Sequence, residues 1–267
     1  MKRSLLLLSL FALLGATGPG KETGLVAYYS FDQCDARDET GGGSDGIIHG
    51  HVECFCGVEE NGLLFDGQGA HLEFGGRVNR VFTTTDFTVS FYFRPLQYTT
   101  FPQSLLGKRT ACDEQNMFDF RLDLNQQQML VEVHETEHKF YPELSPRLDS
   151  TTWMHIALVR AGNRAYTYIN GALRRESYRC SGVDLSNSTP LSFSHSPCIR
   201  HGRTLPFKGI LDELRVYDRA LEPDEILALY ALHPVESAET DCYTYLPEKR
   251  SPALPFDAER AYLCAAY

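Results

Sequence analysis

Polar side chains alternate with apolar ones in several segments of the chain, and their chemistry is the first guide to function. In residues 117–124, Asp119, Arg121 and Asp123 alternate with phenylalanine and leucine. On a β-strand, residues two apart point to the same face, so these three charges would share one side. Two carboxylates on one face could act as an acid and a nucleophile. Arg121 between them instead favours the ionised form of both, which does not suit an acid with a raised pKa.

Two other segments extend this set of polar residues. Residues 87–94 alternate apolar and polar side chains in the same way, and so do residues 129–134. Three interpretations of the polar face stay open: a solvated face with cross-strand charge pairs, a sugar-binding face, or a catalytic face. We predict that one solvent-facing binding surface is formed by Tyr92, Arg94, Asp119, Arg121, Asp123 and Glu132.

Residues 134–138 read HETEH and match the zinc-protease pattern H-E-x-x-H. That chemistry needs a helix, on which histidines four residues apart lie on one side and can hold one ion. The preceding residues alternate like a strand and include two β-branched valines, which favour a sheet. On a strand, His134 and His138 would be ~13 Å apart, too far to share an ion. We therefore predict a strand that ends in a polar turn. His49 and His51 would also share a strand face and could meet a metal, although such pairs are more often simply exposed.

Residues 209–217, GILDELRVY, read as a strand with Ile210, Leu214 and Val216 on its apolar face. Asp212 falls on the same face and breaks the pattern. A carboxylate there needs a partner, because burying an unpaired charge is costly. The alternatives are that Asp212 binds a cation or that it accepts hydrogen bonds from backbone N–H groups.

The body of the chain is rich in short strand-like segments. Residues 153–159 are apolar on both faces, as a central strand of a sandwich is. Asn170-Gly171 stands between two such segments and predicts a tight hairpin turn, because both residues tolerate positive φ. Only the segment after Pro223 reads as a helix, with proline first and acidic residues in the first turn. The pattern predicts an all-β fold, a two-sheet antiparallel sandwich with one short C-terminal helix.

Six blocks of sequence also occur in the order typical of one family. The last block, from Gly209 to Tyr230, resembles that family's closing strand and helix, G-x-I-D-E-x-R-I-Y followed by x-A-L-x-x-x-E-I. The other blocks are GLVAYYSFD (24–32), ARDETGGGSDGIIHG (36–50), GLLFDGQGAHLEF (62–74), DFTVSFYFRP (86–95) and WMHIALVRAGNRAYTYING (153–171). The chain thus resembles the laminin G-like, or concanavalin A-like, jelly-roll domains over about residues 24–232. One departure is Tyr92, where the family usually has tryptophan. The resemblance implies a jelly roll and leaves function open, because this fold hosts many functions.

The resemblance adds two expectations about ligands. Many domains of this family carry a structural calcium, and Asp38 occupies the place of the family's loop aspartate. Together with Asp32 and Asp212 it forms the predicted calcium site, because Ca²⁺ prefers carboxylate and carbonyl oxygens. The loop reads DETGGGSDG instead of D-S-S-G-N-x-x-G, so Asp45 could replace a missing ligand. Laminarinase-like hydrolases of this architecture place E-x-D-x-E on a concave strand, whereas this chain has D-x-R-x-D at residues 119–123.

The first twenty residues read as a secretory signal peptide, with Lys2 and Arg3 before an apolar run from Leu5 to Leu14. A retained anchor helix is the alternative, but neither this run nor any later segment approaches the ~18 apolar residues that a membrane span needs. The chain has 25 basic and 35 acidic residues, a net charge of −10. This charge argues against binding to nucleic acid phosphates. We expect a secreted, cell-surface or periplasmic protein.

Eight cysteines in an exported chain predict disulfide bonds, although they allow 105 pairings. Zinc is the alternative, but the chain has no pair of C-x-x-C motifs. Order along the chain favours the pairs Cys180–Cys198 and Cys242–Cys264. The other four would then pair among themselves: Cys34, Cys54, Cys56 and Cys112.

These observations divide the chain into a signal peptide (1–20), a laminin G-like jelly-roll domain (21–232) and a cystine-tethered C-terminal tail (233–267). The first hypothesis is a secreted, non-catalytic module for binding or adhesion that recognises a glycan or a surface protein. The alternatives are a glycan-cleaving hydrolase or lyase on the same fold, and a purely structural surface protein. A sugar-binding module should present an exposed aromatic platform beside charged residues. An enzyme should present two carboxylates at the floor of a groove.

Overall fold

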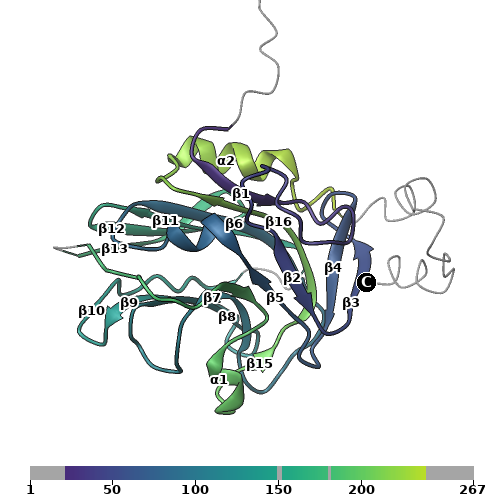
Figure 1. Cartoon of the computed structure of the whole chain (residues 1–267), viewed down its shortest axis with the longest axis horizontal. Helices are drawn as coiled ribbons and strands as arrows, with labels where there is room; N and C mark the ends of the chain where they lie inside the picture. Colours follow the sequence, from purple (N-terminus) through teal and green to yellow (C-terminus); the bar gives the residue numbers. More distant parts are fainter. Residues whose placement is uncertain (1–21, 149–151, 180–181, 239–267) are drawn as a thin grey trace, which may run out of the picture.

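Two β-sheets lie face to face in the computed structural model, which describes residues 22–148, 152–179 and 182–238 (Figure 1). The first sheet has the strand order β13-β12-β11-β6-β16-β4-β3, and β1 also pairs with β16. Its strands are β1 (Leu25–Tyr29), β3 (Val52–Cys56), β4 (Asn61–Asp66), β6 (Phe87–Pro95), β11 (Met154–Ala161), β12 (Arg164–Ile169), β13 (Ala172–Tyr178) and β16 (Lys208–Tyr217).

The second sheet has the order β10-β9-β8-β7-β14-β5-β2, and the short β15 pairs with β7 in parallel. All its other pairings are antiparallel. Its strands are β2 (Gly46–His49), β5 (His71–Phe74), β7 (Gln103–Lys108), β8 (Met117–Asp123), β9 (Gln128–Thr136), β10 (Lys139–Phe140), β14 (Leu191–Phe193) and β15 (Leu205–Pro206). The predicted all-β, two-sheet sandwich is confirmed.

The core between the sheets is built from the apolar positions of the alternating segments. Phe91 of the first sheet contacts Phe120 and Phe193 of the second, with ring centroids 5.4 and 6.2 Å apart. The predicted apolar faces of β6, β8 and β9 all belong to this one core cluster. Each such side chain contributes roughly 1.5–3 kcal/mol through burial. The prediction from periodicity is confirmed for these strands.

The predicted hairpin turn lies between β12 and β13. Asn170 and Gly171 have φ angles of 50° and 72°, as the sequence pair requires. Strand β11 lies between β6 and β12, and its residues are almost all buried, which confirms the prediction of a central strand.

Strand β16 departs from the prediction at a β-bulge. Glu213 has φ 52°, and the pairing with β6 changes register between Asp212 and Arg215. Leu211 therefore joins the core together with Leu214, whereas Ile210 packs on the outer face of the sheet. The placement of Ile210 and Asp212 on the core face was wrong, because an extra residue in a strand reverses the alternation.

Helix α2 (Pro223–Leu232) begins where it was predicted, and Glu222 and Glu225 form a capping box. It lies across the outer face of the first sheet, at the top of Figure 1. The structure adds a second helix of four residues, α1 (Pro197–Arg200), and a 3₁₀ helix (Gly76–Arg80). The predicted C-terminal helix is confirmed, and the one-turn α1 was not predicted because it is too short to show a periodic pattern.

Two disulfide bonds are formed among the described residues, Cys34–Cys54 and Cys112–Cys198. The predicted pair Cys180–Cys198 is therefore wrong, as is the pairing of Cys112 within the N-terminal group. Cys56 is also disulfide-bonded. The predicted bond Cys242–Cys264 lies outside the described residues, as do the signal peptide and most of the tail. Among the described helices, none is long and apolar enough to cross a membrane.

Candidate functional site

The outer faces of the two sheets differ in what covers them. On the first sheet, Ile226 and Leu229 of α2 pack against side chains such as Tyr168 and Tyr217. Tyr92 lies under the same helix, is almost completely buried, and donates its hydroxyl hydrogen to the carbonyls of Leu229 and Tyr230 at 3.3 and 3.2 Å. Of the helices that the structure describes, none lies across the outer face of the second sheet as α2 does on the first, and the one-turn α1 lies below it (Figure 1).

The six predicted binding residues do not share one face. Tyr92 and Arg94 belong to β6 in the first sheet, whereas the other four belong to β8 and β9 in the second. Alternation shows which side of a strand a residue occupies, but it does not show in which sheet the strand pairs. Because Tyr92 is buried, its expected role as a surface contact was wrong. Its loss would disturb the packing of α2.

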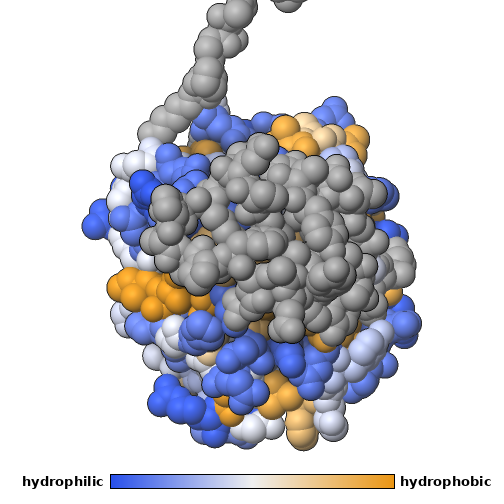
Figure 2. All heavy atoms as spheres, turned by 90° about the vertical axis from the view of Figure 1, so that its right-hand side faces the viewer, coloured by the Kyte–Doolittle hydropathy of each residue, from blue (hydrophilic) through white to orange (hydrophobic). Residues whose placement is uncertain are grey.

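Arg94 lies in a separate groove on the outer face of the first sheet. The groove has a volume of about 300 Å³ and is formed by β3, β4, β6 and β16. Phe55 and Ile210 supply apolar surface, and Lys208 lines it together with Arg94. Figure 2 shows the molecule from the side of β3 and β4, where the visible lower part is mainly hydrophilic with small hydrophobic patches. This groove holds only one of the predicted binding residues.

Two of the four residues predicted on β8 and β9, Arg121 and Glu132, line a polar hollow of about 390 Å³ on the second sheet, whereas Asp119 and Asp123 are not part of its lining. We call it the polar hollow. Arginines and acidic residues dominate its lining, which contains no aromatic ring among the described residues. The lining consists of Arg109, Cys112, Asp113, Glu114, Gln115, Arg121, Glu132, Glu137, Cys198 and Arg203.

A chain of ion pairs forms the floor of the polar hollow. Arg109 Nη1 lies 2.6 Å from Asp119 Oδ2, and both side chains are buried. Arg121 bridges two carboxylates, with its Nε 3.5 Å from Asp119 Oδ2 and its Nη2 2.5 Å from Glu132 Oε1. Burial raises the pKa of Asp119, and the charges of Arg109 and Arg121 oppose that rise. Arg109 also donates to the carbonyls of Ala111 and Asp113, at 3.0 and 2.6 Å, so its guanidinium is held in place.

The floor does not contain the carboxylate pair of a glycoside hydrolase. Asp119 and Asp123 are four residues apart on one strand, or ~13 Å by strand rise. Such enzymes need separations of roughly 5–9.5 Å. Asp123 instead accepts a hydrogen bond from the Gln126 N–H in the turn between β8 and β9, at 3.1 Å. Asp119 and Glu132 lie directly opposite each other, but Arg121 forms an ion pair with each carboxylate. Arg121 was predicted to keep Asp119 and Asp123 ionised, but it lies beside Asp119 and Glu132 instead, and burial raises the pKa of Asp119 despite the charges of Arg109 and Arg121.

The H-E-x-x-H segment does not have the helical geometry of a zinc-protease site. His134 lies within β9 and is nearly buried, and its ring stacks on Phe140 with centroids 4.7 Å apart. His138 lies in the turn after the strand with its side chain 88% exposed. The prediction of a strand ending in a polar turn is confirmed.

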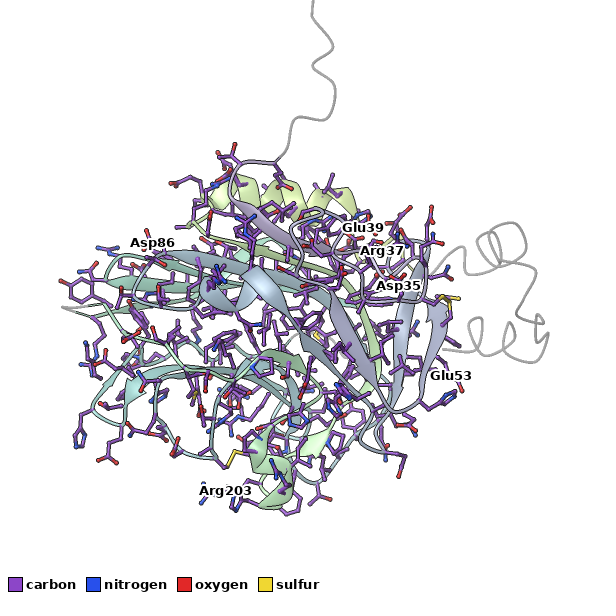
Figure 3. The ribbon with its side chains drawn as sticks, viewed as in Figure 1. Asp35, Arg37, Glu39, Glu53, Asp86 and Arg203 are labelled. Atoms are coloured by element: carbon purple, nitrogen blue, oxygen red, sulfur yellow. A yellow bond between two sulfur atoms is a disulfide. The ribbon has the colours of Figure 1, made fainter. Side chains whose placement is uncertain are left out.

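A disulfide bond closes one wall of the polar hollow. Cys112, in the loop between β7 and β8, is bonded to Cys198 of α1. Arg203 follows α1 and points its Nη1 towards Cys112 Sγ at 3.9 Å; Figure 3 shows Arg203 beside the disulfide at the lower edge of the molecule. The bond joins the β7–β8 loop to α1, 86 residues further along the chain, so both are fixed before a ligand arrives.

The three predicted calcium ligands do not form one set. Asp212 is fully buried on the outer face and accepts hydrogen bonds from the N–H groups of Val58, Glu59 and Glu213 at 2.7, 3.2 and 2.9 Å. Burial, and next the charge of Glu213, raise its pKa. Asp32 faces the same turn, where burial raises its pKa to about 6. These bonds correspond to the backbone-cap alternative.

Asp38 lies in a different loop. Its Oδ1 accepts from the N–H groups of Tyr28 and Thr40, at 3.3 and 3.1 Å, and its Oδ2 accepts from the Ser44 N–H at 3.1 Å. Oxygens that accept from N–H donors face positive partial charges, which does not suit a cation. The geometry therefore does not fit a calcium ion shared by Asp32, Asp38 and Asp212, and calcium binding stays a prediction.

Several polar residues of the interior were not predicted. His155 is fully buried and lies 2.7 Å from Ser90 Oγ, and burial lowers its pKa to about 3. Glu213 lies 2.5 Å from Arg215 and 3.3 Å from His233. Because α2 and the residues after it bury these groups, they are structural. The arginines at 109 and 203 were also missed, since they lie in loops without a periodic pattern.

Comparison with known proteins places this geometry in a family. A model of the concanavalin A-like lectin/glucanases superfamily matches residues 66–227. No curated protein matches.

Solved structures are similar at low identity. Domain 4 of AbnA, an extracellular arabinanase from Geobacillus stearothermophilus in complex with arabinotriose, has a TM-score of 0.61 and 22% identity, covering 79% of this chain and all of that domain. The binding domain of Paraclostridial Mosquitocidal Protein 1 has a TM-score of 0.62 and 16% identity, covering 78% of this chain. The binding domain of botulinum neurotoxin DC, in complex with rat synaptotagmin II, has a TM-score of 0.61 and 11% identity, also covering 78% of this chain.

The chain spans about half of each toxin binding domain, 52% and 51%, and these likenesses show the fold alone. The family model matches more than half of the chain, and the two-sheet sandwich is consistent with that family. The chain belongs to the concanavalin A-like lectin/glucanases superfamily.

Proposed function

We propose that this chain is a secreted, non-catalytic binding or adhesion module that recognises a glycan or a surface protein through the polar hollow. In this proposal residues 1–20 direct export, residues 21–232 form the binding domain, and residues 233–267 are a tail. The observation that carries it is the fixed chain of ion pairs in an open hollow on the sheet that α2 leaves uncovered.

The charges of the hollow favour a neutral, hydroxyl-rich ligand. Three arginines are balanced by four acidic residues, so a polyanion gains little there. Arginine donates hydrogen bonds in a fixed fork, and carboxylates accept them, so the two together match both roles of a sugar hydroxyl. Because the ion pairs already hold these groups, a ligand would not have to order them.

One structural neighbour supports this class of ligand, and another supports a protein partner. The structure of AbnA domain 4 contains arabinotriose, and a toxin binding domain was solved with synaptotagmin II. A protein partner is therefore the other form of the proposal. The lining lacks an aromatic platform among the described residues, so we expect weak affinity for a single glycan, on the order of 10–1000 µM.

The second candidate, a glycan-cleaving enzyme, receives less support. Arg121 lies within ion-pair distance of both Asp119 and Glu132, and a positive charge beside a carboxylate disfavours the protonated form that a general acid needs. We expect no released oligosaccharide from common polysaccharides. Product that depends on Asp119 or Glu132 would place this candidate ahead of the first.

A glycan array, read with calcium and with a chelator, identifies a ligand class. Calorimetry on a hit then compares wild type with Arg121→Ala. We expect roughly 10-fold or greater weakening, since a hydrogen bond to a charged group contributes about 1.5–3 kcal/mol. The variant should fold, because Asp119 keeps its bond to Arg109.

Arg164→Ala is the matched control. Arg164 forms an exposed ion pair with Glu176 at 2.6 Å, on the first sheet and away from the hollow. Binding that is equal in all three proteins would place the ligand site elsewhere and refute the role of the hollow.

A further inference from the structure

Two histidines and a glutamate that the proposed function does not use meet on the outer face of the second sheet. Strands β2 and β5 pair so that His49 stands opposite His71, and Glu73 lies two residues further along β5 on the same face. One ligand atom of each of the three lies within 4.8 Å of the others. His51 is not part of this group. Gly50 has φ 82° between β2 and β3, and β3 pairs in the other sheet, so the expectation that His49 and His51 share a face was wrong.

The backbone orients His71 as a metal ligand. Its Nδ1 lies 3.0 Å from the Gly69 carbonyl oxygen. A carbonyl oxygen can only accept, so Nδ1 carries the hydrogen and Nε2 keeps a free lone pair. Metal-binding histidines commonly have this second bond, which fixes the ring and its tautomer.

His49 offers a second nitrogen that lacks a hydrogen bond. Its Nε2 is shielded from solvent and has no hydrogen-bond partner among the described residues. It lies 3.6 Å from Glu73 Oε2, which is too long for a hydrogen bond. Two ligands on a tetrahedral zinc ion, at bond lengths of about 2.0–2.2 Å, are separated by about 3.4 Å. The two atoms are therefore spaced like neighbours around a metal ion. The rings of His49 and His71 stack with their planes 11° apart, so one of them, the unfixed His49, would rotate on binding to point its nitrogen at the shared ion.

His195 lies close enough to serve as a fourth ligand, and a small hollow adjoins the group. The ring of His195 lies against that of His71, with centroids 4.4 Å apart. Glu73 and His195 both line a small hollow of about 100 Å³. An ion held by His49, His71 and Glu73 would thus have a coordination position open to His195, water or a ligand oxygen.

We propose that His49, His71 and Glu73 bind one divalent transition-metal ion of the zinc type, with His195 in reach as a fourth ligand. Two imidazoles and one carboxylate suit zinc, copper and nickel, whereas calcium and magnesium prefer oxygen ligands alone. The ion would join β2 to the loop after β14. None of its ligands lines the polar hollow, so this proposal does not depend on the proposed function.

The test uses the full mature chain purified without a histidine tag and stripped of metal. We expect calorimetry and elemental analysis to give one Zn²⁺ per chain. At a free Zn²⁺ concentration 100 times the Kd, the melting temperature should rise by roughly 5–10 °C. Ca²⁺ and Mg²⁺ should not raise the melting temperature by binding at this site. Co²⁺ bound in place of Zn²⁺ should give the visible absorption bands of a low-coordinate nitrogen and oxygen site.

The variants His49→Asn and Glu73→Gln should each lower zinc affinity at least 10–100-fold, the range seen when even a supporting group is lost. His51→Asn and His138→Asn are the matched controls, because both side chains are exposed and lie outside the group. Both controls should bind zinc like wild type. Less than one equivalent of zinc in wild type would overturn the proposal, and so would unchanged affinity in His49→Asn and Glu73→Gln. These two variants keep the bond between His71 and Gly69, so they should fold.

Discussion

The buried His155 should make the protein sensitive to mild acid. Its ring is fully buried, its Nε2 is bonded to Ser90, and burial lowers its pKa from 6.5 to about 3. The charges of Arg215 and His233 add to this effect. Between pH 6.5 and 3 the unfolded chain therefore binds a proton at this residue that the folded chain does not. By linkage, the free energy of unfolding falls as the pH drops through this range.

The size of the effect follows from the two pKa values. At pH 5 the folded histidine stays neutral, so the loss is set mainly by the 1.5 pH units below the unfolded pKa of 6.5. At 1.36 kcal/mol per unit, this amounts to about 2 kcal/mol. The opposite sign applies to His233: burial lowers its pKa, but the hydrogen bond to Glu213 outweighs this and raises it overall. Its contribution is present below pH 6.5 and is lost as the pH rises through its folded pKa.

Urea unfolding at pH 7 and pH 5 measures the effect, with wild type compared to His155→Gln. Glutamine does not titrate, so the difference between the two pH values should be about 2 kcal/mol smaller in the variant. This holds even if the variant is less stable at both pH values. His138→Gln, at an exposed position, should keep the wild-type difference. An equal pH dependence in wild type and His155→Gln would refute the reasoning.

Two further predictions concern the covalent and ionic links. Replacing Cys112 and Cys198 by serine should lower the free energy of unfolding by about 4–5 kcal/mol in urea unfolding, because the bond closes a loop of 86 residues; a loss below 1 kcal/mol would contradict this. If calcium binds, chelation should lower the melting temperature, and Asp212→Asn should remove most of that response. Identical melting curves with calcium and with chelator would contradict calcium binding. The role of Asp212 would then be limited to accepting hydrogen bonds from backbone N–H groups.

The local pattern of the sequence was enough for the elements that depend on local physics. Alternation placed Phe91 and Phe120 in the core, since the side-chain period of a strand is 2 wherever no bulge intervenes. The turn at Asn170-Gly171 and the helix start at Pro223 follow from backbone preferences of single residues. For the same reason His134 could be assigned to a strand rather than to a helical zinc motif.

The tertiary structure decided which segments far apart in the chain contact each other. The pairing of strands sent Tyr92 to one sheet and Arg121 to the other, although both patterns look alike. The docking of α2 turned the polar face around Tyr92 into buried structure.

The bulge at Glu213, the bond between Cys112 and Cys198, and the meeting of His49 with Glu73 also depend on the whole fold. The sequence carries no local signal for such contacts, because their free energy arises only when distant segments pack together. Composition and periodicity therefore determined the sandwich, while pairing and packing decided which polar residues form a site.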